Sequence, residues 1–403
     1  MRGVEEKPTA SVQRVAASPA ETTWTVVGDD FLPVEPIEQF LEYLRTRQQS
    51  PNTVKAYARG LQLWWQFVDL YGVEWSAATL EDFGRFLGWL RSGDPPGVAS
   101  IVEREPRFSE RTISLRLHAV SSFYRYHHLN GVGVASRLYE RVFTARGRYK
   151  PFLEHVARRH GSRRSLVAPR SAAATPPPTL TPAQIEAIKD ACASWDEKRR
   201  EWDGRLRDRL LWALLEETGL RLGEALSLQH RDWHTGRGDT PFVEVVPRRH
   251  PHGLRVKGGA YRKLFISDPL DRLYGDYLWT LVEQGADVAV GDLDRHWIFV
   301  NLYREPLFSP TRPETIAAQV RGLRTRLAGR VPPGWTPHWF RHTHATALLL
   351  SGTPLHVVSR RLGHADVQTT QNLYAWVTED AELRAVADWR KFTEDWRTPS
   401  GAC

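Results

Sequence analysis

The sequence predicts a mainly α-helical protein with a small β-sheet or hairpin, an α+β fold divided between two domains. Its 403 residues exceed the usual length of one domain. Apolar residues recur at three- and four-residue steps through most of the chain, which is typical of amphipathic helices. A stretch rich in alanine and proline, 171–178, separates two such regions and reads as a linker.

The first domain is expected over residues 31–140, after a polar extension, 1–30, that has no periodicity and is predicted to be disordered. Helix starts are indicated by Ser50 before Pro51, by Thr79 and by Ser109. The apolar stripes that define the four helices fall at 37–44, 54–71, 83–90 and 113–124.

A basic segment, 141–179, is expected to link the domains. Between residues 141 and 170 it carries nine Lys or Arg against one acid, Glu154. Such a strip suits contact with phosphates, although a solvated linker would have the same composition.

The second domain is predicted over residues 180–403. It opens with Thr181 and Gln184, the spacing of a capping box, and it is mostly helical. Two short runs, Phe242–Val246 and Tyr261–Ile266, read as strands on either side of a glycine turn.

Composition excludes several classes of protein. Two cysteines are too few for a disulfide scaffold or a cysteine-based zinc site. No apolar run is long enough to span a bilayer or to form a secretory signal, so we expect a cytoplasmic protein with no membrane association. The net charge of +8 favours a polyanionic partner.

The histidine-rich stretch HWFRHTHATALLL, 338–350, could form either a metal site or a phosphate site. His338 and His342 have helical ligand spacing, but Trp339 stands where a zinc protease needs glutamate. No carboxylate cluster suited to magnesium accompanies them. His338 and Arg341, three residues apart, would face the same way on a helix and could grip one phosphate. We therefore expect no metal and no cofactor, with His342 and His344 as helix-face residues.

Four further positions could carry chemistry. Arg221 follows a turn glycine in TGLRLGE, near a helix start that favours anions. Lys257 lies in RVKGG at the tip of the expected hairpin, in a chain with only eight lysines, and lysine can donate a proton where arginine cannot. His364 and Tyr374 flank a polar segment after LG. Taken singly, each could equally be a solvated or packing residue.

With these residues in this order, the chain resembles the tyrosine recombinases, also called phage integrases, over about residues 35–395. The resemblance implies a two-domain DNA clamp, a helical core-binding domain and a catalytic domain. It also implies six catalytic residues, Arg221, Lys257, His338, Arg341, His364 and Tyr374. Lys263 on the same hairpin is the alternative to Lys257. Glu224 is expected to support the arginine helix.

The resemblance further implies attack by Tyr374 on a DNA phosphodiester, leaving a 3′-phosphotyrosine and a 5′ hydroxyl, without ATP or metal. It places the basic segment across double-stranded DNA, and the residues expected to contact it are Arg158, Arg159, Arg163 and Arg164. It implies a homotetramer on paired recombination sites, with accessory proteins that set direction. The apolar C-terminal segment, 379–396, would dock on its own subunit or on a neighbour.

Two alternative functions remain open from the sequence. A type IB topoisomerase-like enzyme would use similar chemistry to relax DNA, but the two-domain layout and the LGH segment favour recombination. A non-catalytic DNA-binding relative would need neither Tyr374 nor the lysine. An integrase or a transposase of a mobile element is the function expected first.

Overall fold

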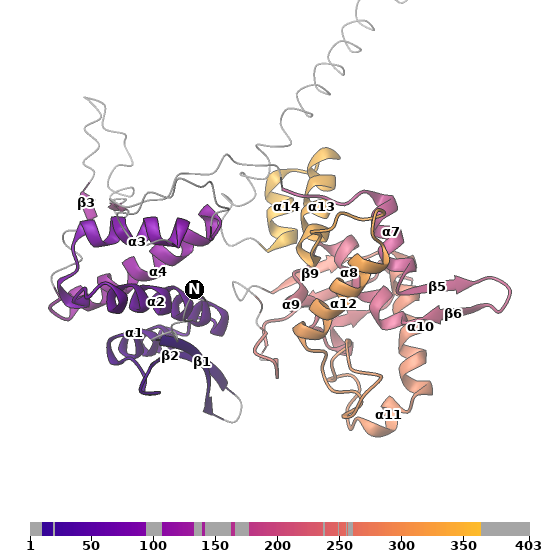
Figure 1. The fold of residues 1–403 in the computed structure, drawn as a ribbon. Coiled ribbons are helices and arrows are strands. Elements are labelled where there is room, and N and C mark those ends of the chain that lie inside the picture. The colour runs from indigo at the N-terminus through magenta and orange to yellow at the C-terminus, as the bar shows by residue number, and fades with distance from the viewer. Residues whose placement is uncertain are drawn as a thin grey trace, which may run out of the picture. The chain divides into compact units, whose positions relative to one another are not determined.

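The structure is a computed structural model that describes residues 10–18, 21–93, 107–132, 139–141, 163–165, 177–236, 238–248, 250–254, 256 and 261–363. The chain divides into two compact units, Met1–Ala174 and Thr175–Cys403 (Figure 1). Both are mainly helical with small antiparallel sheets, as the sequence predicts. Within the described ranges, no helix is long and apolar enough to cross a membrane.

Four α-helices and one 3₁₀ turn form the core of the first unit: α1 (Glu35–Thr46), α2 (Pro51–Leu70), η1 (Trp75–Ala77), α3 (Leu80–Ser92) and α4 (Glu110–Leu129). The predicted caps are confirmed. The Ser50 hydroxyl accepts a hydrogen bond from the Thr53 amide, and Thr79 forms a reciprocal capping box with Asp82. The apolar stripes meet around Trp64, whose indole is fully buried.

The predicted disorder of residues 1–30 is wrong for residues 10–18 and 21–28. Strands β1 (Ala10–Ser18) and β2 (Glu21–Gly28) pair antiparallel, and the side chains of Gln62 and Gln66 on α2 donate hydrogen bonds to the Ala10 carbonyl. The segment looks polar because it is rich in threonine. Threonine is β-branched and favours strands, and Thr23 and Thr25 are buried here beside Val26. The first unit also contains a short pair, β3 (Tyr139–Arg141) with β4 (Arg163–Ser165).

The second unit contains more elements. In chain order they are α7 (Pro182–Asp190), β5 (Ala193–Asp196), β6 (Glu201–Gly204), α8 (Leu206–Thr218), α9 (Leu222–Ala225), η3 (His230–Asp232), β7 (Trp233–His234), β8 (Phe242–Val245), β9 (Arg262–Phe265), α10 (Asp268–Glu283), α11 (Ala286–Ala289), α12 (Pro313–Arg326), α13 (Pro337–Leu350) and α14 (Leu355–Leu362). The capping box at Thr181 is confirmed.

The two predicted strands are confirmed as β8 and β9, which pair antiparallel with Val243 opposite Leu264. Strand β7 adds to the other edge of β8 to give the order β7-β8-β9. The β5–β6 hairpin was not predicted, and it projects from the unit (Figure 1). Its strands are short and highly charged, so they lack an apolar alternation.

Helix α8 is the centre of the second unit. Its leucines are buried almost all round the helix, and complete burial of each stabilises the fold by about 2 kcal/mol. The indole of Trp212 stacks on Phe340 of α13, with ring centroids 5.3 Å apart. This packing fixes the position of Arg341, the next residue on α13.

Candidate active site

Arg221 is placed by a glycine turn between two helices. Helix α8 ends at Gly219, whose φ of 63° is left-handed. A Cβ at this position would lie 2.7 Å from Cδ2 of His344, so both the conformation and the space require glycine. Arg221 then caps α9: its backbone amide donates to Glu224 Oε2 at 3.0 Å, and its Nη1 donates to Glu224 Oε1 at 2.9 Å. The predicted support of Arg221 by Glu224 is confirmed.

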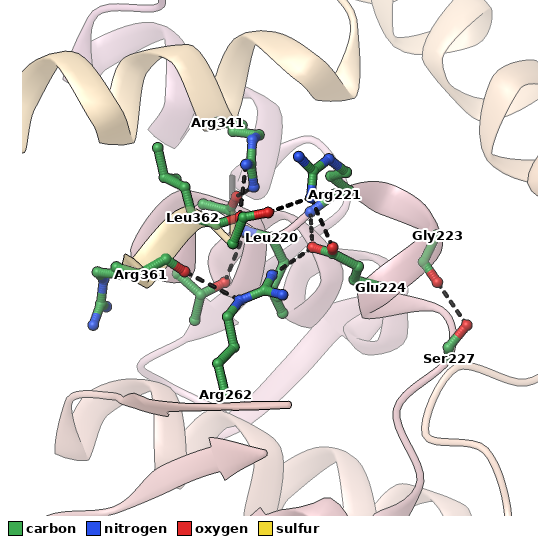
Figure 2. Close-up of polar contacts among 12 residues, drawn as sticks. Leu220, Arg221, Gly223, Glu224, Ser227, Arg262, Arg341, Arg361 and Leu362 are labelled. Atoms are coloured by element: carbon green, nitrogen blue, oxygen red, sulfur yellow. Dashed lines mark hydrogen bonds and ion pairs between the residues drawn. The ribbon is translucent and has the colours of Figure 1, made fainter. Parts of the chain in front are cut away.

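Glu224 is a buried carboxylate between two arginines. Its side chain is 1% exposed and accepts a second ion pair, 2.6 Å long, from Nη2 of Arg262 on β9. Burial would raise the pKa of Glu224, but Arg262 and Arg221 outweigh it and hold the pKa below its ordinary value. The carboxylate is therefore ionised at neutral pH and fixes both guanidinium groups (Figure 2).

Arg341 links the Gly219 turn to the end of α14. The residue is 3% exposed. Its Nη1 donates to the Gly219 carbonyl at 2.8 Å, and its Nη2 donates to the Leu362 carbonyl at 2.7 Å. A guanidinium has five N–H donors, so these two bonds leave others for a ligand.

Three consecutive carbonyls at the C-terminus of α14 each accept a hydrogen bond from a different arginine. Arg262 Nε binds the Arg361 carbonyl at 3.1 Å. Arg341 binds the Leu362 carbonyl, and Arg221 Nη1 lies 3.5 Å from the Gly363 carbonyl (Figure 2). The last carbonyls of a helix have no partner within it and carry partial negative charge, so cations suit them.

The site has an excess of positive charge. Among the described residues, three guanidinium groups, those of Arg221, Arg262 and Arg341, share one carboxylate, Glu224, which leaves a net charge of +2 (three less one). Burial, together with the charge of Arg221, lowers the pKa of Arg341 to about 9. Arg341 is still charged at neutral pH, and an anion entering the site would relieve the repulsion between the arginines.

The histidines of α13 differ in exposure and in partners. His338, in the first turn, is exposed, and its ring is 4.4 Å from the ring of His342 in an edge-on contact. His344 is partly buried and accepts a hydrogen bond at 3.0 Å from Arg361 Nε. Within the described ranges, no group of three His, Cys, Asp or Glu is arranged to hold a metal ion.

Several predicted residues lie outside the described residues. They are Lys257, His364, Tyr374, Arg158 and Arg159. Gly363, the last described residue, directly precedes His364. Arg163 and Arg164 belong to β4, where they pair with Arg141 and Glu140 of β3.

Lys263, the alternative lysine, lies on the exposed face of β9. Its Nζ is 3.3 Å from the ring centroid of Phe242 and 5.0 Å from that of Phe265. Side chains alternate along a strand, and Arg262 and Leu264 point to the buried face. Lys263 therefore points to the face of β9 opposite Arg262 and the arginine cluster.

Arg262 was not predicted as part of the site. The sequence does carry a sign of it. In the strand 261–266, the alternation puts Arg262 on the same face as Leu264 and Ile266, and an arginine on the apolar face of a strand needs a buried acidic partner.

Family models match both units. The model described as the phage integrase family matches residues 178–380, and that of the phage integrase N-terminal SAM-like domain matches residues 37–130. Transposase A from transposon Tn554 of Staphylococcus aureus is 30% identical over 88% of this chain and 91% of its own length. Tyrosine recombinase XerD of Mycobacterium leprae is 29% identical over 87% of this chain and 94% of its own length.

Solved structures share the fold at lower identity. XerH site-specific recombinase bound to a palindromic difH substrate is 18% identical, with a TM-score of 0.56 over 88% of this chain and 84% of its own. The Tn1549 transposon integrase in complex with circular intermediate DNA is 15% identical, with a TM-score of 0.53 over 83% of this chain and 94% of its own. With the family models and the 30% identical relative, these matches show that the chain belongs to the phage integrase family, the tyrosine recombinases.

Proposed function

We propose that this protein is a site-specific recombinase that cleaves and rejoins DNA of a mobile element through a covalent bond between Tyr374 and a DNA 3′ phosphate. The observation that carries the proposal is the positively charged cluster of Arg221 and Arg341, which fixed protein contacts hold in place. The cluster would bind an anion. Because the chain belongs to the tyrosine recombinase family, we propose that this anion is a DNA phosphodiester.

In the proposed reaction, the hydroxyl oxygen of Tyr374 attacks the phosphorus of one DNA strand. A phosphorus–oxygen bond to tyrosine forms while the bond to the 5′ oxygen breaks, and the electron pair leaves with that oxygen. His338 accepts the tyrosine proton or hydrogen-bonds the phosphate, and Lys257 donates a proton to the leaving oxygen. A 5′ hydroxyl of another strand then reverses these steps, so rejoining requires no ATP.

Arg221 and Arg341 have the electrostatic role. Negative charge gathers on the two non-bridging oxygens as phosphorus becomes pentacoordinate, and planar guanidinium groups suit such oxygens. Because both arginines are already fixed by carbonyls or by Glu224, little reorganisation is needed when the transition state forms. His364, next to the turn that holds them, would supply a further donor.

The position of Lys263 supports Lys257 as the proton donor. The Lys263 ammonium contacts two aromatic rings on the face of β9 opposite the arginine cluster. Lys257 lies before β9 in the sequence, in the segment that joins β8 to β9, and we assign the proton transfer to it.

Two arginines of the first unit suggest where it contacts DNA. Arg116 on α4 is partly buried, and burial and the charge of Arg59 on α2 lower its pKa. Neither arginine forms an ion pair with a described residue. A phosphate between Arg59 and Arg116 would relieve this repulsion. We therefore add these two residues to the expected DNA contacts, which are Arg158, Arg159, Arg163 and Arg164.

The reaction proposed here exchanges strands between two sites, and a homotetramer would bring four copies of Tyr374 to them. We propose that the protein acts in the cytoplasm and that accessory proteins set the direction of recombination. The 30% identical relative is named a transposase, which favours movement of a mobile element. No observation favours relaxation of DNA over strand exchange.

The test is a covalent trap in cells that carry the native DNA. Tagged full-length protein is recovered under denaturing conditions, and the attached DNA is sequenced, with Tyr374→Phe in parallel. The proposal predicts one recurrent DNA site with the wild-type protein and none with the variant. Equal recovery from both proteins, or native binding of both with no adduct on nicked substrates either, would contradict it.

A further inference from the structure

We infer that Arg262 is a positioning residue for strand cleavage, which holds the Arg221 turn and the C-terminus of α14 together through one buried guanidinium group. This inference rests on the proposed function. Two donors of Arg262, Nη2 and Nε, are used within the protein, by the Glu224 carboxylate and by the Arg361 carbonyl. Its side chain is 6% exposed, and we assign it a positioning role because its two contacts join two segments of the site.

The guanidinium of Arg262 spans two elements that are distant in the sequence. Nη2 contacts Glu224 Oε2 at 2.6 Å, and Nε contacts the Arg361 carbonyl at 3.1 Å. Through Glu224 it is connected to Arg221, and through the α14 carbonyls to the turn that binds Arg341. A planar fork fixes these two contacts at one spacing, which the single ammonium of lysine cannot do.

Gly363 shows how closely Arg262 fits the turn after α14. A Cβ at residue 363 would lie 2.7 Å from Nη1 and 2.9 Å from Cζ of Arg262, and Gly363 has a left-handed φ of 64°. The guanidinium therefore packs directly against the backbone that leads into His364. Nη1 is buried and has no hydrogen-bond partner among the described residues, so packing and not a third bond holds it there.

The chain path extends this connection to the proposed proton donor. Arg262 is the first residue of β9 and follows Lys257 by five positions. One side chain thus connects the segments that carry Arg221, Lys257 and His364. A displacement of about 1 Å at a reacting group can cost a factor on the order of 100 in rate, so loss of this connection should act on the cleavage step.

Removal of Arg262 should also change the pH dependence of the rate of adduct formation. The charged groups that face Glu224 are Arg262 on β9, Arg221 at the start of α9, and Arg341 on α13. Without Arg262, burial favours the protonated form of Glu224, and the remaining arginines oppose it less. Glu224 would then take up a proton as the pH falls towards the acidic range, and its ion pair with Arg221 would be lost.

The test compares Arg262→Met, Arg262→Lys and the matched control Arg207→Met in the full chain. Arg207 is also buried, with an adjacent carboxylate (Asp208) and a carbonyl of another segment (Val300) as partners, and none of its described contacts is with a proposed catalytic residue. The substrate is a nicked duplex with the DNA site recovered in the trap. DNA affinity and the single-turnover rate of adduct formation are measured from mildly acidic to mildly alkaline pH.

The inference predicts that Arg262→Met slows adduct formation by about 100-fold at neutral pH and leaves DNA affinity unchanged. At acidic pH the decrease in rate should be larger. Arg262→Lys should recover the wild-type pH profile and part of the rate, because it keeps the charge beside Glu224. Arg207→Met should lower the temperature of unfolding and leave the rate of the folded protein unchanged.

A wild-type rate and pH profile in Arg262→Met would overturn the inference, as would parallel losses of DNA affinity and rate. If Arg262→Met does not fold, Arg262→Lys decides: a full wild-type rate refutes the positioning role, and a slower rate with unchanged affinity supports it. Absence of adduct with the wild-type protein would refute the proposed function itself, which distinguishes the two failures.

Discussion

At the scale of single residues, arginine is used where one side chain must contact two partners in one plane. Arg341 contacts carbonyls on both sides of the site, and Arg262 joins a carboxylate to a carbonyl. Lysine presents a point charge without a planar fork, so it would not hold two partners at one fixed spacing. Lys257, the lysine that we propose as the proton donor, would have a task that arginine cannot perform.

His344 is predicted to make the second unit sensitive to acid. Burial, with the charge of Arg361, lowers its pKa to about 4, whereas an unfolded histidine titrates near 6.5. The folded state therefore binds fewer protons than the unfolded state between these values, and stability falls as the pH drops from about 6.5 to about 4. We expect the free energy of unfolding to be about 2 kcal/mol lower at about pH 5 than at about pH 7.5 on account of this group.

The measurement is urea unfolding of the full chain at both pH values, compared with His344→Gln. Glutamine keeps an acceptor for Arg361 Nε and does not titrate. His230 and His250 also have pKa values lowered to about 4, but they titrate equally in both proteins. An identical loss of stability in the wild type and the variant would contradict the assignment to His344.

Candidate site residues could be proposed from the sequence where the chemistry of phosphate binding limits which residue types are suitable. The spacing of His338 and Arg341, and the turn before Arg221, indicated a phosphate grip without any structure. Arg262 could not be assigned from spacing, because its partners, Glu224 and the Arg361 carbonyl, are 38 and 99 positions away in the sequence. Long-range pairs of this kind depend on how strands and helices pack.

At the scale of elements, the turn at Gly219 controls the site. Its carbonyl accepts a hydrogen bond from Arg341, and a Cβ at this position would meet His344 and Leu362 within 3 Å. We predict that Gly219→Ala destabilises the protein by about 2 kcal/mol or more, because it combines strain at positive φ with a close contact. Loss of the Arg341 contact should reduce cleavage as well.

The control for this variant is Gly329→Ala. Gly329 also has a positive φ, 78°, but a Cβ there would have no atom within 4 Å. The two variants share the conformational strain, so the difference between their urea midpoints measures the close contact. Equal midpoints would mean that the turn can move and that Gly219 does not fix Arg341.

Elements with a local signal were predicted well. Helices α1 to α4 follow from their apolar stripes and caps, and β8 and β9 from two apolar runs around a glycine turn. The β1–β2 and β5–β6 hairpins were missed because threonine or charged residues conceal their alternation. Their pairing becomes visible only when the strand partner is known.

At the scale of the whole molecule, the two units divide the work. The second unit holds the arginine cluster, and the first unit presents Arg59 and Arg116 without acidic partners among its described residues. The sequence predicted two domains from its length and from the alanine- and proline-rich linker, and their roles only from the family resemblance. It could not predict the arrangement of the two units, because that arrangement does not follow from local sequence signals.

The most direct test of the central claim is to identify the residue that bonds to DNA. Purified protein reacts with the nicked duplex in the presence of a metal chelator, and the adduct is digested and examined by mass spectrometry. The tryptic peptide 362–384 contains Tyr374 as its one tyrosine. We predict a nucleotide linked to this peptide through a 3′ phosphate, with no effect of the chelator and no adduct in Tyr374→Phe. An adduct at another residue, or an equal yield from Tyr374→Phe, would contradict the account.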